Sequence, residues 1–325
     1  MVDSSSARLS AMTRRYPALL SFIACAASVS TWAADPHLPT NAAEIDNLAR
    51  TVAGAGDSVT RTQRLVSWMN SRLEWVATDY QSRTPEQILA RGAGNCADLS
   101  SVLERLMRPA AIPYRWVAEI NLEPASDERE ANAREMVKEG GPKMSVFGRR
   151  HNDHRWLEVL DERSSEWVPA DPSTGLVGTQ PWLLARVAFE ERPPALVPAA
   201  AASLADMIVP LTIFVTKDKA GVRVDRSQHY LIDELDRLYG GKAHTLPSWT
   251  AWKAAVQRFA PIAQGAFDNR IDLHQQSALI DELATAYAAL TKEAHAAGLR
   301  HSRTTARNSN PPTITNGIAV TAPGK

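Results

Sequence analysis

The chain has 325 residues, and its 36 basic side chains equal its 36 acidic side chains, so the formal net charge is zero. This balance argues against a protein that binds nucleic acid through a basic surface. Only one long apolar run occurs, near the N-terminus, and the length allows one sizeable core with a smaller second unit.

The first 33 residues have the order of a secretory signal peptide. Basic residues precede an apolar run over 16–33, and Ala33 offers a small residue for cleavage; a start at Met12 would give the same mature chain. Serines, a proline and a threonine interrupt the run, which argues against a permanent membrane anchor. A lipid anchor on Cys25 and twin-arginine export are weaker alternatives. We therefore expect a periplasmic or secreted protein without stable membrane insertion.

Cysteine usage limits the chemistry of the exported chain. The sequence holds only Cys25 and Cys96, and Cys25 would leave with the signal peptide. The mature protein could then form no internal disulfide. An unpaired thiol in an oxidising compartment is at risk of oxidation, so its presence indicates either burial in the core or a chemical role.

Helical patterns dominate the first part of the mature chain. Apolar residues recur at helical spacing over 41–52 and again over 59–73. A third, shorter helix is predicted to begin after Thr84 as N-cap, with a proline at its first position and Gln87 closing a capping box. This helix should end at Gly92.

Residues 92–96 interrupt the helical pattern, which resumes over 97–107 with apolar residues on one face. Asn95 is a suitable N-cap and Asp98 stands where a capping acid is expected, so Cys96 falls in the first helical turn. There the helix dipole favours the thiolate, which is the nucleophilic form of cysteine. A structural cysteine would more naturally lie on the apolar face, so this position indicates chemistry.

A nucleophilic thiol needs a base that accepts its proton, and the base needs an orienting acceptor. His154 begins a predicted strand over 154–159, and 165–170 has the pattern of its hairpin partner, which ends at Asp171. Such a hairpin would bring His154 and Asp171 together, so that the carboxylate could hold the imidazole in one tautomer.

Four sequence blocks around these residues occur in an order typical of a known family. They are Gly-x-Gly-Asn-Cys-x-Asp at 92–98, Ile-Pro-Tyr-Arg-Trp-Val at 112–117, His-x-Trp-x-Glu-Val at 154–159 and Trp-Val-Pro-Ala-Asp-Pro at 167–172. Together they resemble the transglutaminase-like superfamily over roughly residues 60–185. Asn95 and Ala111 depart from the usual family pattern, and neither departure removes a catalytic atom.

The resemblance implies an α+β fold with a papain-like core, in which a helix bearing the cysteine packs on an antiparallel sheet bearing the histidine and the acid. It also implies the roles of three residues: Cys96 as nucleophile, His154 as general base and acid, and Asp171 as orienting carboxylate. No cofactor is implied. We expect this catalytic domain to span residues 41–190.

Acyl transfer also needs donors for the oxyanion, and the backbone N–H of Cys96 is the natural one. Family members often add an aromatic or amide donor upstream of the cysteine, which makes Trp75 a candidate. The alternative for Trp75 is an ordinary core tryptophan. Gln87 is a weaker candidate because it already fits its helix cap.

Two further features of the catalytic region have simpler interpretations. The segment 121–150 is longer and more charged than a strand connection needs, and we expect a solvated loop in preference to a lid over the site. His151 and His154 suggest a metal-binding pair, but no second cluster would complete the coordination. No metal is therefore expected.

Beyond the catalytic region the composition changes. An alanine-rich, proline-punctuated linker is expected at 191–205 and a mainly helical region at 206–300. Within that region, 207–215 is apolar enough for a strand or buried segment, and three amphipathic helices are predicted, separated by a Gly-Gly pair and by Pro261. The polar residues 301–325 lack periodicity and are expected to be disordered.

Two functional hypotheses of different class follow from the sequence. The first is an exported bacterial cysteine enzyme that cleaves or transfers at amide bonds of a protein or peptide through an acyl-thioester on Cys96, with hydrolysis favoured. The second is a catalytically silent domain that binds peptide or cell-envelope material in the same cleft. The complete set of Cys96, His154 and Asp171 favours the first.

Overall fold

The structure, a computed structural model, describes residues 38–39, 41–76, 81–122, 127–189, 209–217 and 220–301. The signal peptide expected at 1–33 and the linker expected at 191–205 lie outside these ranges, as does the expected tail except for His301. Within the described ranges, no helix has both the length and the apolar character needed to cross a membrane.

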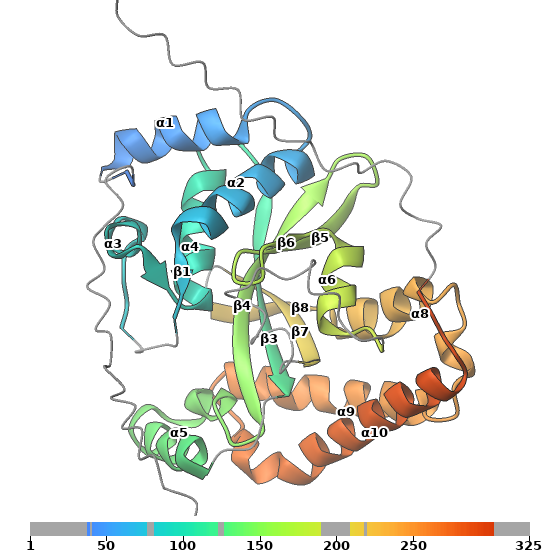
Figure 1. Ribbon diagram of the computed structural model, residues 1–325. Helices are drawn as coiled ribbons and strands as arrows, with labels where there is room; N and C mark the ends of the chain where they lie inside the picture. The colour runs from blue at the N-terminus through green and yellow to red at the C-terminus, as the bar shows by residue number, and fades with distance from the viewer. Residues whose placement is uncertain are drawn as a thin grey trace, which may run out of the picture. The chain divides into compact units, whose positions relative to one another are not determined.

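A six-stranded antiparallel sheet forms the centre of the fold (Figure 1). Its strands lie in the order β6–β5–β4–β3–β7–β8. Their bounds are β3 Tyr114–Leu122, β4 His151–Asp161, β5 Glu166–Asp171, β6 Leu176–Val177, β7 Val209–Lys217 and β8 Ala220–Asp225. Two short strands, β1 (Glu74–Trp75) and β2 (Ala93–Gly94), form a separate parallel pair.

Helices pack on both faces of the six-stranded sheet. The α-helices are α1 Ala42–Ala53, α2 Ser58–Arg72, α3 Pro85–Arg91, α4 Cys96–Met107, α5 Asp127–Gly140, α6 Thr179–Arg186, α8 Leu235–Leu238, α9 Trp249–Phe267 and α10 Ser277–Ala296. Shorter turns are the 3-10 helices η1 Pro142–Val146, η4 Ala243–Thr245 and η5 Leu273–Gln276, and the π-helix η3 His229–Glu234.

Each face of the sheet has its own hydrophobic core, because successive side chains of a strand point to opposite faces. Trp116 and Leu157 belong to a core shared with α1 to α4, whereas Val117 and Trp156 belong to a core shared with α6, η3, α9 and α10. Fully burying a large apolar side chain contributes roughly 1.5–3 kcal/mol. The expected α+β class, with the cysteine helix packed on an antiparallel sheet, is confirmed.

Local capping signals predicted the start of the third helix correctly. Thr84 Oγ1 accepts a hydrogen bond from the backbone N–H of Gln87 at 3.3 Å, and Gln87 Oε1 accepts one from the Thr84 N–H at 2.9 Å. Gly92 then ends α3 in the left-handed conformation, with φ of 70°. These bonds satisfy donors that a helix start would otherwise leave unpaired.

The expectation of a solvated loop over 121–150 was wrong. Residues 127–140 form helix α5, and η1 follows it. The helix is mostly exposed and buries Ala133, while Glu130 and Glu135 pair with Arg134 and Lys138 along its surface. Residues of high helix propensity and pairs three or four positions apart stabilise such a helix even without an apolar stripe.

The expected helix break at Pro261 was also wrong, because α9 continues through this residue to Phe267. An interior proline costs about 3 kcal/mol or more in a helix. Here Phe259, Ala260 and Ala263 are buried on both sides of the proline, and their packing outweighs that cost. The chain turns instead after the helix, where Asn269 adopts a positive φ of 62°.

A strand or buried segment was expected at 207–215; its described part, from Val209 onward, lies in strand β7, and this has a consequence for domain organisation. β7 pairs with β3 along most of its length, and β8 extends the sheet beyond it. The C-terminal residues therefore complete the sheet that carries the candidate site, and α9 and α10 cover one of its faces.

Candidate active site

Cys96 is the first residue of α4, and its surroundings explain how it is held there. Asn95 Oδ1 accepts from the backbone N–H of Asp98 at 3.0 Å, and Asp98 Oδ2 accepts from the Asn95 N–H at 3.4 Å, so both halves of a capping box are present. A side chain at Gly94 would bring a Cβ within 2.6 Å of the Asp98 Cβ, so this position requires glycine. The thiol of Cys96 is free and partly exposed.

His154 and Asp171 are brought together by the predicted hairpin. β4 and β5 pair in antiparallel register from Leu157–Ala170 to Asp161–Glu166, so that Asp171 follows the last paired residue of β5. His154 Nε2 lies 2.8 Å from Asp171 Oδ2, and both side chains are buried. With Nε2 bonded to the carboxylate, Nδ1 is the ring nitrogen left for the thiol.

The electrostatic surroundings of His154 favour its charged form. Burial lowers the pKa of His154, but the charge and hydrogen bond of Asp171, together with the Cys96 side chain within hydrogen-bonding range, raise it well above its ordinary value. The protonated ring is stabilised wherever an anion lies this close. Such a site can hold a thiolate beside an imidazolium.

Asp171 is fully buried and its two oxygens are both engaged. Oδ1 accepts from the backbone N–H of Ser173 at 3.0 Å, and Oδ2 lies 3.3 Å from Nη1 of Arg186 in α6. Burial alone would raise the pKa of Asp171, but His154, Arg186 and the Ser173 N–H lower it below the ordinary value. The carboxylate is therefore fixed in position and kept ionised.

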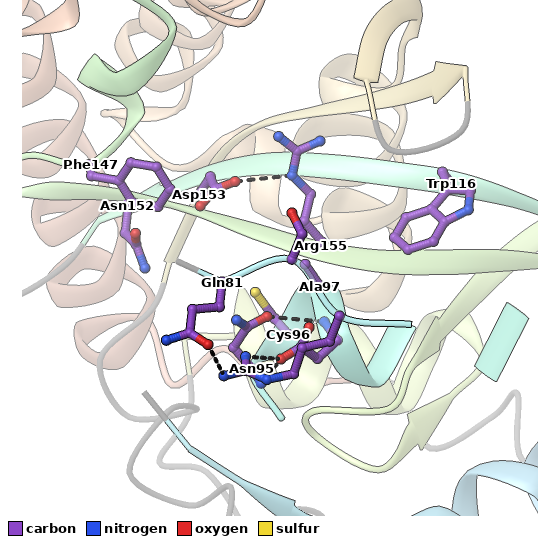
Figure 2. Close-up of a pocket in the computed structure, with 12 residues that line it drawn as sticks. Gln81, Asn95, Cys96, Ala97, Trp116, Phe147, Asn152, Asp153 and Arg155 are labelled. Carbon is purple, nitrogen blue, oxygen red and sulfur yellow. Dashed lines mark hydrogen bonds and ion pairs between the residues drawn. The ribbon is translucent and has the colours of Figure 1, made fainter. Parts of the chain in front are cut away.

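A cleft of about 320 Å³ opens at the cysteine (Figure 2). Figure 2 shows Cys96 at the start of α4, with Asn152, Asp153 and Arg155 along β4 and Phe147 beside them. The complete lining is Gln81, Ser82, Arg83, Asn95, Cys96, Ala97, Asp98, Trp116, Phe147, Asn152, Asp153 and Arg155. His154 is not among these residues, and its side chain is 8% exposed.

Two ion pairs give the cleft its polar character. Arg155 Nε lies 3.0 Å from Asp153 Oδ2, and Arg83 Nη1 lies 3.5 Å from Asp98 Oδ2. All four side chains are at most 16% exposed. The lining of the cleft thus carries both signs of charge.

Trp75, the predicted side-chain donor for the oxyanion, lies in β1 beside the strand that leads to Cys96. Its Cα partner in β2 is Gly94, two residues before the cysteine. The ring packs against the core shared with the N-terminal helices, yet its Nε1 is buried without a hydrogen-bond partner among the described residues. A buried donor of this kind is costly unless a ligand or water satisfies it.

Glu119 and Arg186 were not predicted as site residues. Glu119 is fully buried in β3, and its carboxylate bonds to Arg186, which in turn reaches Asp171. The sequence did contain a signal, because a charged residue in the middle of an apolar strand requires a buried partner. The partner could not be identified, since Arg186 comes 67 residues later in the chain.

Over the described ranges, no group of three or more His, Cys, Asp or Glu side chains could hold a metal ion.

Comparison with known proteins supports a family assignment for the region that carries the site. Residues 46–172 match the model of the transglutaminase-like superfamily, and no curated protein matches the chain. One similar solved structure is a candidate cysteine protease from Cytophaga hutchinsonii, at 15% identity and a TM-score of 0.28, which covers 55% of this chain and 44% of that one. The chain thus spans less than half the length of the Cytophaga protein.

A second similar structure is LapG of Legionella pneumophila, at 12% identity and a TM-score of 0.28, which covers 61% of this chain and 96% of LapG. At such low identities and scores, neither structure carries an argument about function. The family model is independent of them, and the matched region contains all three residues that the motifs singled out. The family whose model this region of the chain matches is therefore the transglutaminase-like superfamily, over residues 46–172.

Proposed function

We propose that the chain is an exported cysteine enzyme that hydrolyses amide bonds of a peptide or protein through an acyl-thioester on Cys96. One observation carries the proposal: a thiol at a helix start lies close enough to a buried imidazole to raise its pKa, and that imidazole is hydrogen-bonded to a buried carboxylate. The leader-like sequence of residues 1–33 supports export.

In the first step His154 takes the thiol proton of Cys96, which gives a thiolate and an imidazolium. Asp171 stabilises the imidazolium through its bond to Nε2. The sulfur then attacks the substrate carbonyl carbon, and the carbonyl oxygen becomes an oxyanion. The C–N bond breaks as His154 gives its proton to the leaving amine, which leaves an acyl-thioester on Cys96.

The second step returns the enzyme to its starting state. Water attacks the thioester carbonyl while His154 accepts a proton from that water. The C–S bond then breaks, the acid product leaves and the thiol is restored. An amine in place of water would give transfer. The charged lining of the cleft, with Asp153, Arg155 and Arg83, favours a hydrated site and therefore hydrolysis.

Two groups are proposed to stabilise the oxyanion. The backbone N–H of Cys96 lies in the first turn of α4, where such groups have no partner within the helix. The second is Nε1 of Trp75, which has no hydrogen-bond partner among the described residues; Trp75 does not itself line the cleft described above. Removing one oxyanion donor typically costs about 10²–10³ in turnover, so the two donors together would supply a large part of the catalysis.

Turnover of a panel of peptides and cell-envelope proteins tests this function. We expect Cys96→Ala and His154→Ala to abolish cleavage without loss of fold, measured by mass spectrometry of products and by circular dichroism. His151→Ala is the matched control, because His151 is also a buried histidine of β4 but bonds to the carbonyl of Ser145 instead of Asp171. It should retain activity.

Two outcomes would contradict the proposal. Cleavage by Cys96→Ala at the wild-type rate would show that the sulfur is not the nucleophile. Binding of peptides without turnover, together with alkylation of Cys96 no faster than that of glutathione, would instead identify a catalytically silent binding domain.

A further inference from the structure

Arg186 creates an electrostatic difficulty at the candidate site. Its Nη1 lies 3.3 Å from Asp171 Oδ2, the same oxygen that bonds to His154 Nε2. The guanidinium is 1% exposed, so water screens its charge very little. It orients the carboxylate, but a cation this close also weakens the attraction between Asp171 and an imidazolium at His154.

Glu119 lies on the other side of the guanidinium. Its Oε1 is ion-paired with Nη2 of Arg186, and the carboxylate is fully buried. It also accepts from Trp156 Nε1 at 2.9 Å and from Asn121 Nδ2 at 3.2 Å, which fixes its position. In the sheet, Glu119 is the Cα partner of His154, so the two residues lie opposite each other on neighbouring strands and on the same face of the sheet.

The guanidinium of Arg186 therefore lies between the carboxylates of Asp171 and Glu119. Asp171, Arg186 and Glu119 together carry one net negative charge, which an imidazolium at His154 would neutralise. Without Glu119 the remaining pair would be neutral, and an imidazolium beside it would leave a net positive charge in a buried place. Burial of an uncompensated charge is strongly unfavourable.

We propose that Glu119 is a positioning residue of the site, which offsets the charge of Arg186 and so leaves the negative charge of Asp171 available to His154. Only the benefit of this arrangement for catalysis rests on the proposed function. The effect of the charges on His154 needs no substrate. Arg186 and Glu119 then act together: the arginine orients Asp171, and the glutamate compensates for the arginine.

A second buried glutamate provides a matched control. Glu158 lies on β4, is fully buried like Glu119, and is paired with Arg115, Arg226 and the hydroxyl of Tyr230. It has no described contact with Asp171 or His154. Substitution of Glu158 by glutamine should disturb packing about as much as the same substitution at Glu119, without changing the charge around His154.

The test measures the titration of His154 by NMR in the full chain carrying Cys96→Ala, so that the ring titrates without the thiol. In this background we expect Glu119→Gln to lower the ratio of imidazolium to imidazole at His154 about tenfold at a fixed pH. This corresponds to a fall of about 1 in the pKa of His154. Glu158→Gln should leave the ratio unchanged. Adding Arg186→Met to Glu119→Gln should restore it, because the net charge is again that of Asp171 alone.

The proposal would be overturned if Glu119→Gln left the ratio of imidazolium to imidazole at His154 equal to that of the Cys96→Ala background. It would also be overturned if this ratio stayed as low in the variant with both Glu119→Gln and Arg186→Met as in Glu119→Gln alone. Glu119→Asp, which keeps the charge, should stay close to the background. If Glu119→Gln does not fold, the double variant decides, because it leaves no unpaired buried charge: a tenfold lower ratio there would overturn the inference. All of these outcomes are independent of turnover, so failure of the proposed enzymatic function would be seen separately.

Discussion

Replacing Asp171 with asparagine removes the buried negative charge at the site and keeps the shape of the side chain. In the wild type, Oδ1 accepts from the Ser173 N–H, while Oδ2 faces His154 Nε2 and Arg186 Nη1. An amide has only one acceptor oxygen, so its NH₂ group must face donors in either orientation. The imidazolium at His154 would lose its charged partner in both.

The size of the effect follows from Coulomb's law. Two unit charges about 4 Å apart interact by ~4 kcal/mol at an effective dielectric constant of about 20, and each ~1.36 kcal/mol corresponds to a factor of ten. The hydrogen bond that an amide can retain offsets part of this energy. We therefore expect the thiolate–imidazolium population at pH 6, and with it the alkylation rate of Cys96, to fall roughly 10–1,000-fold.

The assay is the rate of iodoacetamide labelling, followed by mass spectrometry of the peptide that holds Cys96, in wild type and Asp171→Asn. The variant should still fold, because Arg186 retains its ion pair with Glu119; thermal unfolding checks this. A folded variant that labels at the wild-type rate would refute the claim that Asp171 stabilises a protonated His154.

Three further changes have defined outcomes. Trp75→Phe removes the indole N–H and keeps the ring, so turnover should fall about 10²-fold while alkylation of Cys96, which forms no oxyanion, stays the same; unchanged turnover would exclude Trp75 as a donor. Gly94→Ala would place a Cβ 2.6 Å from that of Asp98, so we expect a lower melting temperature and slower labelling, and an unaltered variant would contradict the need for glycine. Burial lowers the pKa of His151 in the folded protein to about 4. As the pH falls below about 6.5, the imidazole of His151 is therefore protonated in the unfolded chain before it is protonated in the folded protein. The stability that neutral His151 contributes, roughly 3 kcal/mol, is present above pH 6.5 and lost toward pH 4. Urea unfolding at pH 7 and 4.5 should show a smaller acid loss in His151→Gln than in wild type, and equal losses would refute the assignment.

Local signals in the sequence predicted the parts of the site that local structure determines. The cap at Asn95 placed Cys96 in the first turn of a helix, and the hairpin pattern placed His154 near Asp171. Both depend on hydrogen bonds between residues close in sequence or on adjacent strands. Such interactions leave a readable pattern of cap residues, turn residues and alternating apolar residues.

Features that depend on packing between distant segments were not readable in this way. Pro261 predicts a break by its own chemistry, and only the buried residues around it explain why α9 continues. The segment 121–150 lacks an apolar stripe, so its helix was not expected. Arg186 and Glu119 are far apart in sequence, and their pairing follows from the way α6 packs against the sheet at β5 and β6.

The central claim is that the sulfur of Cys96 becomes acylated during cleavage of an amide bond. The most direct measurement is acid quenching of the enzyme during turnover of a cleaved peptide, followed by mass spectrometry of the peptide that contains Cys96. We predict an added mass equal to the acyl half of the substrate, released by hydroxylamine and absent from Cys96→Ala. Cleavage that proceeds with no such adduct, and at the same rate in Cys96→Ala, would contradict the account.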